Sequence, residues 1–384
     1  YSGHSPSMRF HAIHTIGSLG INAGGPSRTV PNLCDQLLSS EKDVDLTILT
    51  GADKRFGANV MPKLTPVVSS HSNTSRAFRT LLNERIDNIA AKGQRQLILH
   101  DHGQWLAVNR ASASIARKYD LKRIVTPRGM LTPWAMSHQY TKKKLAWLLF
   151  GRRDFHDATL LHATSEMEAC ELRDLGARQP IAVIPNGVET LPDSQICEKP
   201  KCVLFLSRIH VVKGVSELVE AWRSLSPGGW NLILAGPDEG RLLDQLELTP
   251  TDNITYVGQV EGEQKWKLMR DASVFVLPSH SENFGVVVAE ALMAGTPVIA
   301  THGTPWKSLV DRDCGWWIPM NVDSLKETLK TAMQVDQASL QAMGQRGRTH
   351  AIESFGWPSI GQQMAAVYSW MLGLGDMPDC VQLR

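Results

Sequence analysis

The chain has 384 residues, 42% of them hydrophobic, and a formal net charge of +2 at pH 7. This length predicts two domains with full cores, and the small net charge excludes a protein directed mainly at polyanions. No apolar run reaches the roughly 18 residues of a transmembrane helix, and the six scattered cysteines are typical of a reducing compartment. We therefore expect a cytoplasmic protein without a secretion signal. Residues 1–7, ahead of Met8, are expected to be a remnant of cloning and not part of the folded protein.

The first predicted strand covers residues 9–16 and leads into a loop that contains Gly24 and Gly25. Glycine lets a backbone approach a ligand closely, so this is a candidate binding loop, with an ordinary strand-to-helix turn as the alternative. It lacks the three spaced glycines of a dinucleotide-binding fingerprint. Apolar spacing through 30–38 predicts a helix, in which Pro31 must lie in the first turn or bend the helix because it has no N–H group.

A second predicted strand, 97–102, ends with His100 and His102 at alternate positions before a glycine. Two histidines at such a loop point to function about as strongly as to a structural role. Another predicted strand, 124–126, ends shortly before Arg128. No third ligand lies at metal-site spacing from the histidines, so we expect no zinc site.

Charge is distributed unevenly along this half. Residues 108–153 contain eleven Lys or Arg and one acid, Asp120. Within them, 142–153 interleaves the cations Lys142–Lys144, Arg152 and Arg153 with the apolar Trp147, Leu148 and Phe150. Such a stretch can lie on an anionic membrane surface, and the alternative is that its apolar residues pack inward. No nucleic-acid-binding module is recognisable, so nucleic acid is not an expected partner.

The order of elements predicts a second sheet after a hinge. A strand at 158–163 and a helix at 165–175 precede the segment 181–187, and the polar, proline-containing stretch 191–200 is the predicted hinge. Strands then alternate with helices, which is typical of a doubly wound parallel sheet. These strands are predicted at 202–206, 231–235, 254–257, 273–277 and 297–300.

Arg208 and Lys213 stand five residues apart in the loop after the predicted strand 202–206, and a helix follows from 215. Ligands bind at the carboxyl ends of strands in open α/β sheets. An arginine there can hold a phosphate through two parallel N–H bonds, and a lysine adds a point charge. Two solvated surface cations are the alternative.

Glu282 and Glu290 bracket the start of a predicted helix that begins near 283–285 and ends before Gly295. The helical rise separates the two carboxylates by roughly 10 Å along the axis. This is about the span from the sugar to the ribose in a nucleotide sugar. The free N–H groups at the helix start would then face the diphosphate. The alternative is a pair of acids that only flank a buried helix.

Together these segments resemble the retaining GT-B glycosyltransferases of family 4, which use nucleotide-diphosphate sugars. The resemblance extends from Met8 to about Met371. It implies an α/β fold with two doubly wound, Rossmann-like domains facing a cleft, at 8–192 and 193–358. The final segment, 359–384, would form a helix that crosses back to the first domain.

The resemblance also implies roles for individual residues in the second domain. Arg208 and Lys213 would hold the diphosphate, Glu282 would contact donor-sugar hydroxyls, and Glu290 would bind the ribose. Ser207 stands where the family usually has glycine, which is a small change. The remaining donor contacts would come from the backbone at Asn283, Phe284, Gly285 and Val260.

In the first domain, Gly24 and Gly25 would border the donor phosphate and sugar. Many relatives have a histidine near the position of Arg128, so Arg128 is a donor-binding candidate without the usual histidine role. His102 is then the nearer candidate for contact with the donor sugar or the acceptor.

The implied activity is sugar transfer, with retention, from a UDP- or GDP-linked sugar to a glycan or a lipid-linked oligosaccharide. This is the chemistry of polysaccharide and lipopolysaccharide synthesis. No metal and no cofactor would be needed, because the cations neutralise the leaving diphosphate. Two alternatives stay open: a sugar-nucleotide epimerase of the same architecture, and a catalytically silent nucleotide-sugar-binding protein. The enzyme would be cytoplasmic, or peripheral on the inner face of the cell membrane.

Overall fold

The computed structural model describes residues 10–20, 24–40, 44–52, 63–93, 96–137, 140–192, 199–238 and 240–383. Parts of the predicted binding loop (21–23) and of the predicted hinge (193–198) lie outside the described residues. The chain forms two compact units. Unit 1 ends at Gly187 and resumes at Trp357, and unit 2 is Val188–Gly356. Among the described helices, none is long and apolar enough to cross a membrane.

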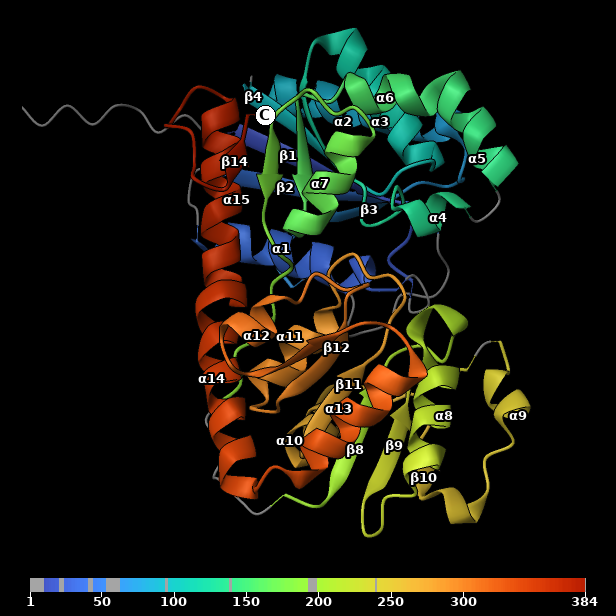
Figure 1. The fold of residues 1–384 in the computed structure, drawn as a ribbon. Helices are drawn as coiled ribbons and strands as arrows, with labels where there is room; N and C mark the ends of the chain where they lie inside the picture. The colour runs from blue at the N-terminus through green and yellow to red at the C-terminus, as the bar shows by residue number, and fades with distance from the viewer. Residues whose placement is uncertain are drawn as a thin grey trace, which may run out of the picture. The chain divides into compact units, whose positions relative to one another are not determined.

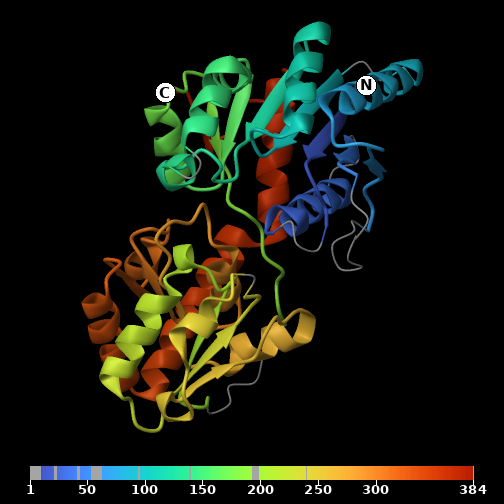
Figure 2. The same cartoon turned by 90° about the vertical axis from the view of Figure 1, so that its right-hand side faces the viewer.

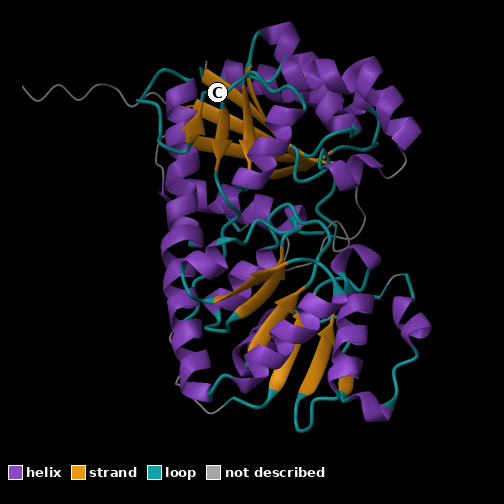
Figure 3. Cartoon of the chain, viewed as in Figure 1, coloured by secondary structure: helices purple, strands orange, loops and turns teal. Residues whose placement is uncertain are grey.

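Unit 1 contains an eight-stranded sheet in the order β14-β7-β6-β5-β4-β1-β2-β3, parallel except for β14 (Figures 1 and 3). The strands are β1 (Phe10–Ile16), β2 (Val44–Thr50), β3 (Val67–Ser69), β4 (Gln96–His102), β5 (Lys122–Thr126), β6 (Leu160–Ala163), β7 (Ile181–Val183) and β14 (Val381–Gln382). The helices are α1 (Pro26–Ser40), α2 (Ser75–Ala91), α3 (Ala107–Tyr119), α4 (Pro133–Ser137), α5 (Tyr140–Ala146), the π-helix η1 (Trp147–Gly151), α6 (Arg152–His156), α7 (Glu166–Asp174) and α15 (Trp357–Met371).

Helices cover both faces of this sheet, so its strands are apolar on both sides. Along β1, Ala12 packs into the cluster under α1 and α15, whereas its neighbour Ile13 packs into the cluster under α2 and α3. Pro31 lies inside α1, in the second turn, because this helix begins at Pro26; of the two predicted alternatives, the first-turn position is therefore excluded. The predicted return of the last helix to the first domain is confirmed, since α15 packs on α1 within unit 1 (Figure 1).

Unit 2 contains a six-stranded parallel sheet in the order β10-β9-β8-β11-β12-β13, flanked by helices (Figure 2). The strands are β8 (Cys202–Leu206), β9 (Asn231–Ala235), β10 (Ile254–Tyr256), β11 (Val274–Leu277), β12 (Val298–Thr301) and β13 (Gly315–Ile318). The helices are the 3-10 helix η2 (Val211–Lys213), α8 (Val215–Leu225), α9 (Leu242–Leu246), the 3-10 helix η3 (Pro250–Asp252), α10 (Gly262–Asp271), α11 (Val286–Met293), α12 (Ser308–Asp311), α13 (Val322–Gln334) and α14 (Gln337–Phe355).

The predicted fold class, with two doubly wound parallel sheets, is therefore confirmed. The strand order reverses between β1 and β4 in unit 1, and between β8 and β11 in unit 2. Ligands of open α/β sheets bind at the carboxyl ends of the strands beside such a reversal. Each unit thus has one edge where a site is expected.

Candidate functional site

In unit 2 the candidate residues gather in the loops after β8 and β11. The loop after β8 turns through η2 and Gly214 into α8, with Gly214 at a φ of 65°. A Cβ atom on Gly214 would lie 2.0 Å from the carbonyl oxygen of Pro278, so only glycine fits this turn. The tight turn brings Lys213 against the loop that follows β11.

Lys213 and Glu282, both predicted site residues, form an ion pair between Nζ and Oε1. Their side chains are only 12% and 13% exposed. Ser279 Oγ donates to the same carboxylate oxygen at 3.0 Å, and the Glu282 N–H donates to Gly303 O at 2.8 Å. The structure therefore brings two distant candidates into direct contact and adds Ser279, which sequence reasoning missed.

Arg208 lies in the same loop as Lys213 and is exposed. Within the described part of the chain, its side chain has no hydrogen-bond or ion-pair partner. The guanidinium charge at this edge is therefore uncompensated and open to an anionic ligand.

Helix α11 begins at Val286, close to the predicted start at 283–285. Gly285 precedes it with a φ of 76°, and the first turn carries no acid. Trp306 Nε1 donates to Phe284 O at 2.6 Å, and the Phe284 side chain is buried against Trp306 and Phe355. The Phe284 side chain is therefore not available to a ligand, and only its backbone could contact one.

Glu290 lies in α11 and pairs with Lys265 of α10 at 2.7 Å. Their side chains are about as buried as the Lys213–Glu282 pair. Nothing in the sequence indicates Lys265 as a site residue, because a single cation in an amphipathic helix is common. Val260, another candidate, is buried in the core of unit 2, so only its backbone is available.

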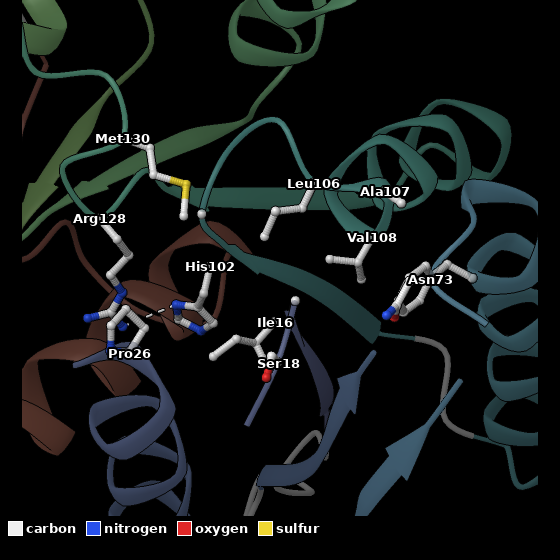
Figure 4. Close-up of a pocket in the computed structure, with 13 residues that line it drawn as sticks. Ile16, Ser18, Pro26, Asn73, His102, Leu106, Ala107, Val108, Arg128 and Met130 are labelled. Carbon is white, nitrogen blue, oxygen red and sulfur yellow. Dashed lines mark hydrogen bonds between the residues drawn. The ribbon is translucent and has the colours of Figure 1, made fainter. Parts of the chain in front are cut away.

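In unit 1 a cavity of about 390 Å³ lies at the carboxyl ends of β1 and β4 (Figure 4). Arg128 and His102 lie together at one end of this cavity and Asn73 at the other (Figure 4). The residues that line it are Ile16, Gly17, Ser18, Pro26, Asn73, Phe78, His102, Gly103, Leu106, Ala107, Val108, Arg128 and Met130. Among these described residues Arg128 alone carries a full charge. Gly24 and Gly25 sit immediately before Pro26, the first residue of α1.

Arg128 is fixed by three side chains. Nη1 donates to Asn186 Oδ1 at 2.5 Å and to Thr29 Oγ1 at 3.3 Å, and Nη2 donates to His102 Nδ1 at 3.1 Å. Burial lowers the pKa of Arg128 to about 10, so the group stays charged at neutral pH. Glu168, an acid whose charge acts on Arg128, accepts from the Gly129 N–H at 3.0 Å instead of pairing with the guanidinium.

His102 is the first member of a buried hydrogen-bond chain beneath the cavity, which we call the histidine chain. Its further links are His102 Nε2 to His14 Nδ1 (2.9 Å), His14 Nε2 to the Tyr368 hydroxyl (3.0 Å), and Tyr368 to His100 Nδ1 (2.6 Å). The chain ends with His100 Nε2 to Thr126 Oγ1 (2.8 Å), Thr126 to His162 Nδ1 (2.9 Å), and His162 Nε2 to Ile184 O (2.8 Å).

The two ends of the histidine chain determine its proton positions. Arg128 can only donate, so His102 Nδ1 accepts and a neutral His102 must carry its proton on Nε2. The same reasoning gives Nε2–H at His14, while Ile184 O can only accept and so requires Nε2–H at His162. Tyr368 and Thr126 then both donate in the same direction. One proton per ring satisfies every link.

Burial keeps these histidines neutral. It lowers the pKa of His14 and of His162 to about 3, and it also lowers the pKa of His100 and of His102. Both ring nitrogens of His102 are engaged, so this candidate orients Arg128 and has no free nitrogen for a proton transfer.

A third histidine, which spacing along the chain did not reveal, lies beside His100 and His102 in the folded protein. The parallel register of β1 on β4 pairs His14 with His100, and ligand atoms of His14, His100 and His102 lie within 4.8 Å of one another. Each of their ring nitrogens already has a hydrogen-bond partner in the histidine chain, so a cation would have to displace these bonds. The cluster fits hydrogen bonding better than metal ligation.

Both halves of the chain match glycosyltransferase families. Residues 24–187 match the glycosyl transferase 4-like domain, and residues 189–350 match glycosyl transferases group 1. The glycogen synthase of Mycobacterium tuberculosis is 27% identical over 289 residues, which are 71% of this chain and 68% of that protein. The putative colanic acid biosynthesis glycosyltransferase WcaL of Escherichia coli is 27% identical over 231 residues, 56% of this chain and 57% of that protein.

Solved structures share the fold. Sucrose-phosphate synthase from Thermosynechococcus elongatus superposes with a TM-score of 0.75 at 20% identity, covering 95% of this chain and 100% of that one. HepE of Anabaena, solved with UDP and glucose, superposes with a TM-score of 0.71 at 19% identity, covering 94% and 100%. From the two matched halves and the shared architecture, the chain is a glycosyltransferase of the GT-B type.

Proposed function

We propose that this enzyme moves a sugar from a nucleotide-diphosphate sugar to a glycan or lipid-linked sugar, with retention at the anomeric carbon. The observation that carries the proposal is the edge of unit 2, where uncompensated Arg208 stands in the same loop as the Lys213–Glu282 pair. Two cations with a neighbouring acid suit a diphosphate joined to a sugar. The HepE structure with UDP and glucose, and the relative in colanic acid synthesis, support this class of donor and acceptor.

In the proposed reaction, the bond between the anomeric carbon and the diphosphate oxygen breaks as the acceptor oxygen attacks from the same face. A donor phosphate oxygen takes the acceptor proton. Arg208, Lys213 and the N–H groups at the start of α11 stabilise the negative charge on the departing diphosphate. Lys213 would then share its charge between the diphosphate and Glu282, which leaves the carboxylate free to accept from a sugar hydroxyl. These groups can do the work of a divalent cation.

Glu290 is proposed to bind the ribose, with Lys265 holding its carboxylate in place at 2.7 Å. The backbone at Val260 would read the base, which is UDP- or GDP-linked. In unit 1, Gly24, Gly25 and Arg128 are proposed to contact the donor phosphate and sugar. The histidine chain fixes the guanidinium of Arg128 without adding charge, because all of its members are neutral.

A membrane surface is a proposed partner of unit 1, for a cytoplasmic enzyme at the inner face of the cell membrane. Lys142, Lys144, Arg152 and Arg153 are exposed, and Leu148 of η1 is 66% exposed. Trp147, in contrast, packs inward. Cations beside an outward leucine suit an anionic bilayer and a lipid-linked acceptor.

The competing functions are a sugar-nucleotide epimerase and a catalytically silent nucleotide-sugar binder. A thermal-shift screen over UDP-, GDP- and ADP-sugars should reveal one donor that stabilises the protein, since a bound ligand stabilises the folded state. Consumption of that donor should then rise with one added glycan, which gains a sugar. Epimerisation without an acceptor, or binding without any consumption, would assign the protein to one of the competing functions.

A further inference from the structure

A second cavity of unit 1, of about 250 Å³, is rich in arginine and shares no lining residue with the first. It is bordered by residues of α2, α3, η1 and α6; α2, α3 and α6 are labelled in Figure 1. Its lining residues are Ser75, Arg79, Arg110, Ser114, Arg117, Leu149, Phe150, Arg153 and Asp154. We call this cavity the arginine cavity.

The arginine cavity carries an excess of positive charge. Arg117 is already paired, because it donates to Asp154 and Asp157 at 2.9 Å each, and Asp157 also lies 3.5 Å from Arg153. Arg79 is exposed and its side chain has no partner within the described residues. Four guanidinium groups thus face two carboxylates.

Arg110 is oriented without being neutralised. Its guanidinium lies over the ring of Phe150, 4.1 Å from the centroid. Such a contact holds the planar group in one direction and leaves its charge and its N–H fork available. Arg79 and Arg110 together therefore offer two unpaired guanidinium groups to one anion.

An apolar surface borders the same cavity. Leu149 lines the cavity and is 70% exposed, and Leu145 and Leu148 of the same segment are 58% and 66% exposed. The segment is anchored from beneath, because Trp147 packs on Trp105 and Phe155 with ring centroids 5.8 and 5.5 Å away. The leucines thus stay on the outside of a fixed helical segment.

We propose that the arginine cavity binds the phosphate of an anionic membrane lipid while Leu145, Leu148 and Leu149 enter the acyl layer. This proposal rests on the proposed membrane contact of unit 1, and it identifies the site on the protein that makes this contact. Arginine holds a phosphate by two parallel N–H bonds, and Ser114 lines the same space. A lipid satisfies both the cations and the leucines, whereas a polynucleotide would leave the leucines in water.

The test compares variants that alter geometry with variants that alter charge. Arg79→Lys/Arg110→Lys keeps the charge but loses the bidentate fork, and Lys142→Gln/Lys144→Gln removes two cations outside the cavity. Binding to phosphatidylglycerol vesicles is measured by flotation at physiological salt. We expect the charge-conserving pair to weaken binding roughly tenfold. Diffuse attraction would leave that pair unchanged and weaken only the lysine variant, and this result would overturn the proposal.

A soluble probe separates this proposal from the wider membrane contact. Titration with monomeric dihexanoyl phosphatidylglycerol should show binding that Arg79→Gln/Arg110→Gln abolishes and Lys142→Gln/Lys144→Gln preserves, with unchanged melting temperatures in both. If the protein binds this probe but does not bind vesicles, the phosphate site in the arginine cavity is supported and the membrane contact is refuted. Tighter binding of inorganic phosphate or of a single-stranded oligonucleotide than of the lipid would overturn the assignment to a lipid.

Discussion

Arg128 donates from Nη2 to Nδ1 of His102 at 3.1 Å, and this contact sets the proton positions of His102 and His14 at one end of the histidine chain. A charged donor at one end and the carbonyl of Ile184 at the other leave one consistent arrangement. The buried and neutral histidine chain therefore orients Arg128, which is the one fully charged residue among the described residues that line the first cavity of unit 1.

Tyr368 is the central link of this network, so Tyr368→Phe should destabilise the fold. Removal of the hydroxyl leaves His14 Nε2 without an acceptor and His100 Nδ1 without a donor. Burying two unpaired groups costs about 2 kcal/mol or more. Urea unfolding measures the loss. The matched control is Tyr140→Phe, because Tyr140 is 55% exposed; an equal effect of the two substitutions would contradict the network.

Stability should fall as the pH drops below the ordinary histidine value of about 6.5. Burial lowers the pKa of His14 and His162 to about 3, so the unfolded chain binds protons that the folded chain excludes. Each such histidine removes about 1.4 kcal/mol per pH unit, progressively between pH 6.5 and 3. Urea unfolding at a series of pH values tests this. The exposed histidine variant His71→Ala should show the same pH dependence as the unaltered protein, and a flat profile between pH 7 and 5 would be the contrary result.

Substitution of Glu282 and substitution of Glu290 in unit 2 should have different effects on nucleotide binding and on turnover. Glu290→Ala should weaken binding of the free nucleotide diphosphate, because its proposed partner is the ribose. Glu282→Ala should leave that binding nearly intact and lower turnover, because its proposed partner is the sugar. Calorimetry with the nucleotide diphosphate distinguishes them, and equal losses in both variants would refute the assignment.

Transfer should continue in the presence of EDTA. In the proposed mechanism, the cations Arg208 and Lys213 and the N–H groups of α11 would supply the charge that a metal provides in metal-dependent enzymes. The measurement is the transfer rate with and without the chelator, followed by addition of manganese. Loss of activity that manganese restores would defeat this part of the mechanism.

Much of this architecture could be predicted from local patterns, but side-chain partners could not. Apolar strands and the glycine before α11 are visible within a few residues, so the two sheets and the start of that helix were predictable. Strand β13 was missed, because Gly315–Ile318 is short and only partly buried. The approach of His14 to His102 depends on the register between β1 and β4, which no local pattern contains.

The ion pairs show the same limit. Lys213 and Glu282 were both candidates, yet their contact depends on the tight turn at Gly214. Lys265 reaches Glu290 only because α10 packs beside α11. Spacing along the chain can select residues of the right chemistry, while the pairing between loops and helices comes from tertiary packing.

The central claim is that the edge of unit 2 holds the diphosphate of the donor, and Arg208→Ala tests it most directly. Loss of this contact should cost roughly 2–4 kcal/mol of transition-state stabilisation, or about 30- to 1000-fold in transfer rate. The melting temperature should hold, because Arg208 is exposed, and the exposed-lysine control Lys330→Ala should keep full activity. A transfer rate for Arg208→Ala equal to that of Lys330→Ala would contradict the account.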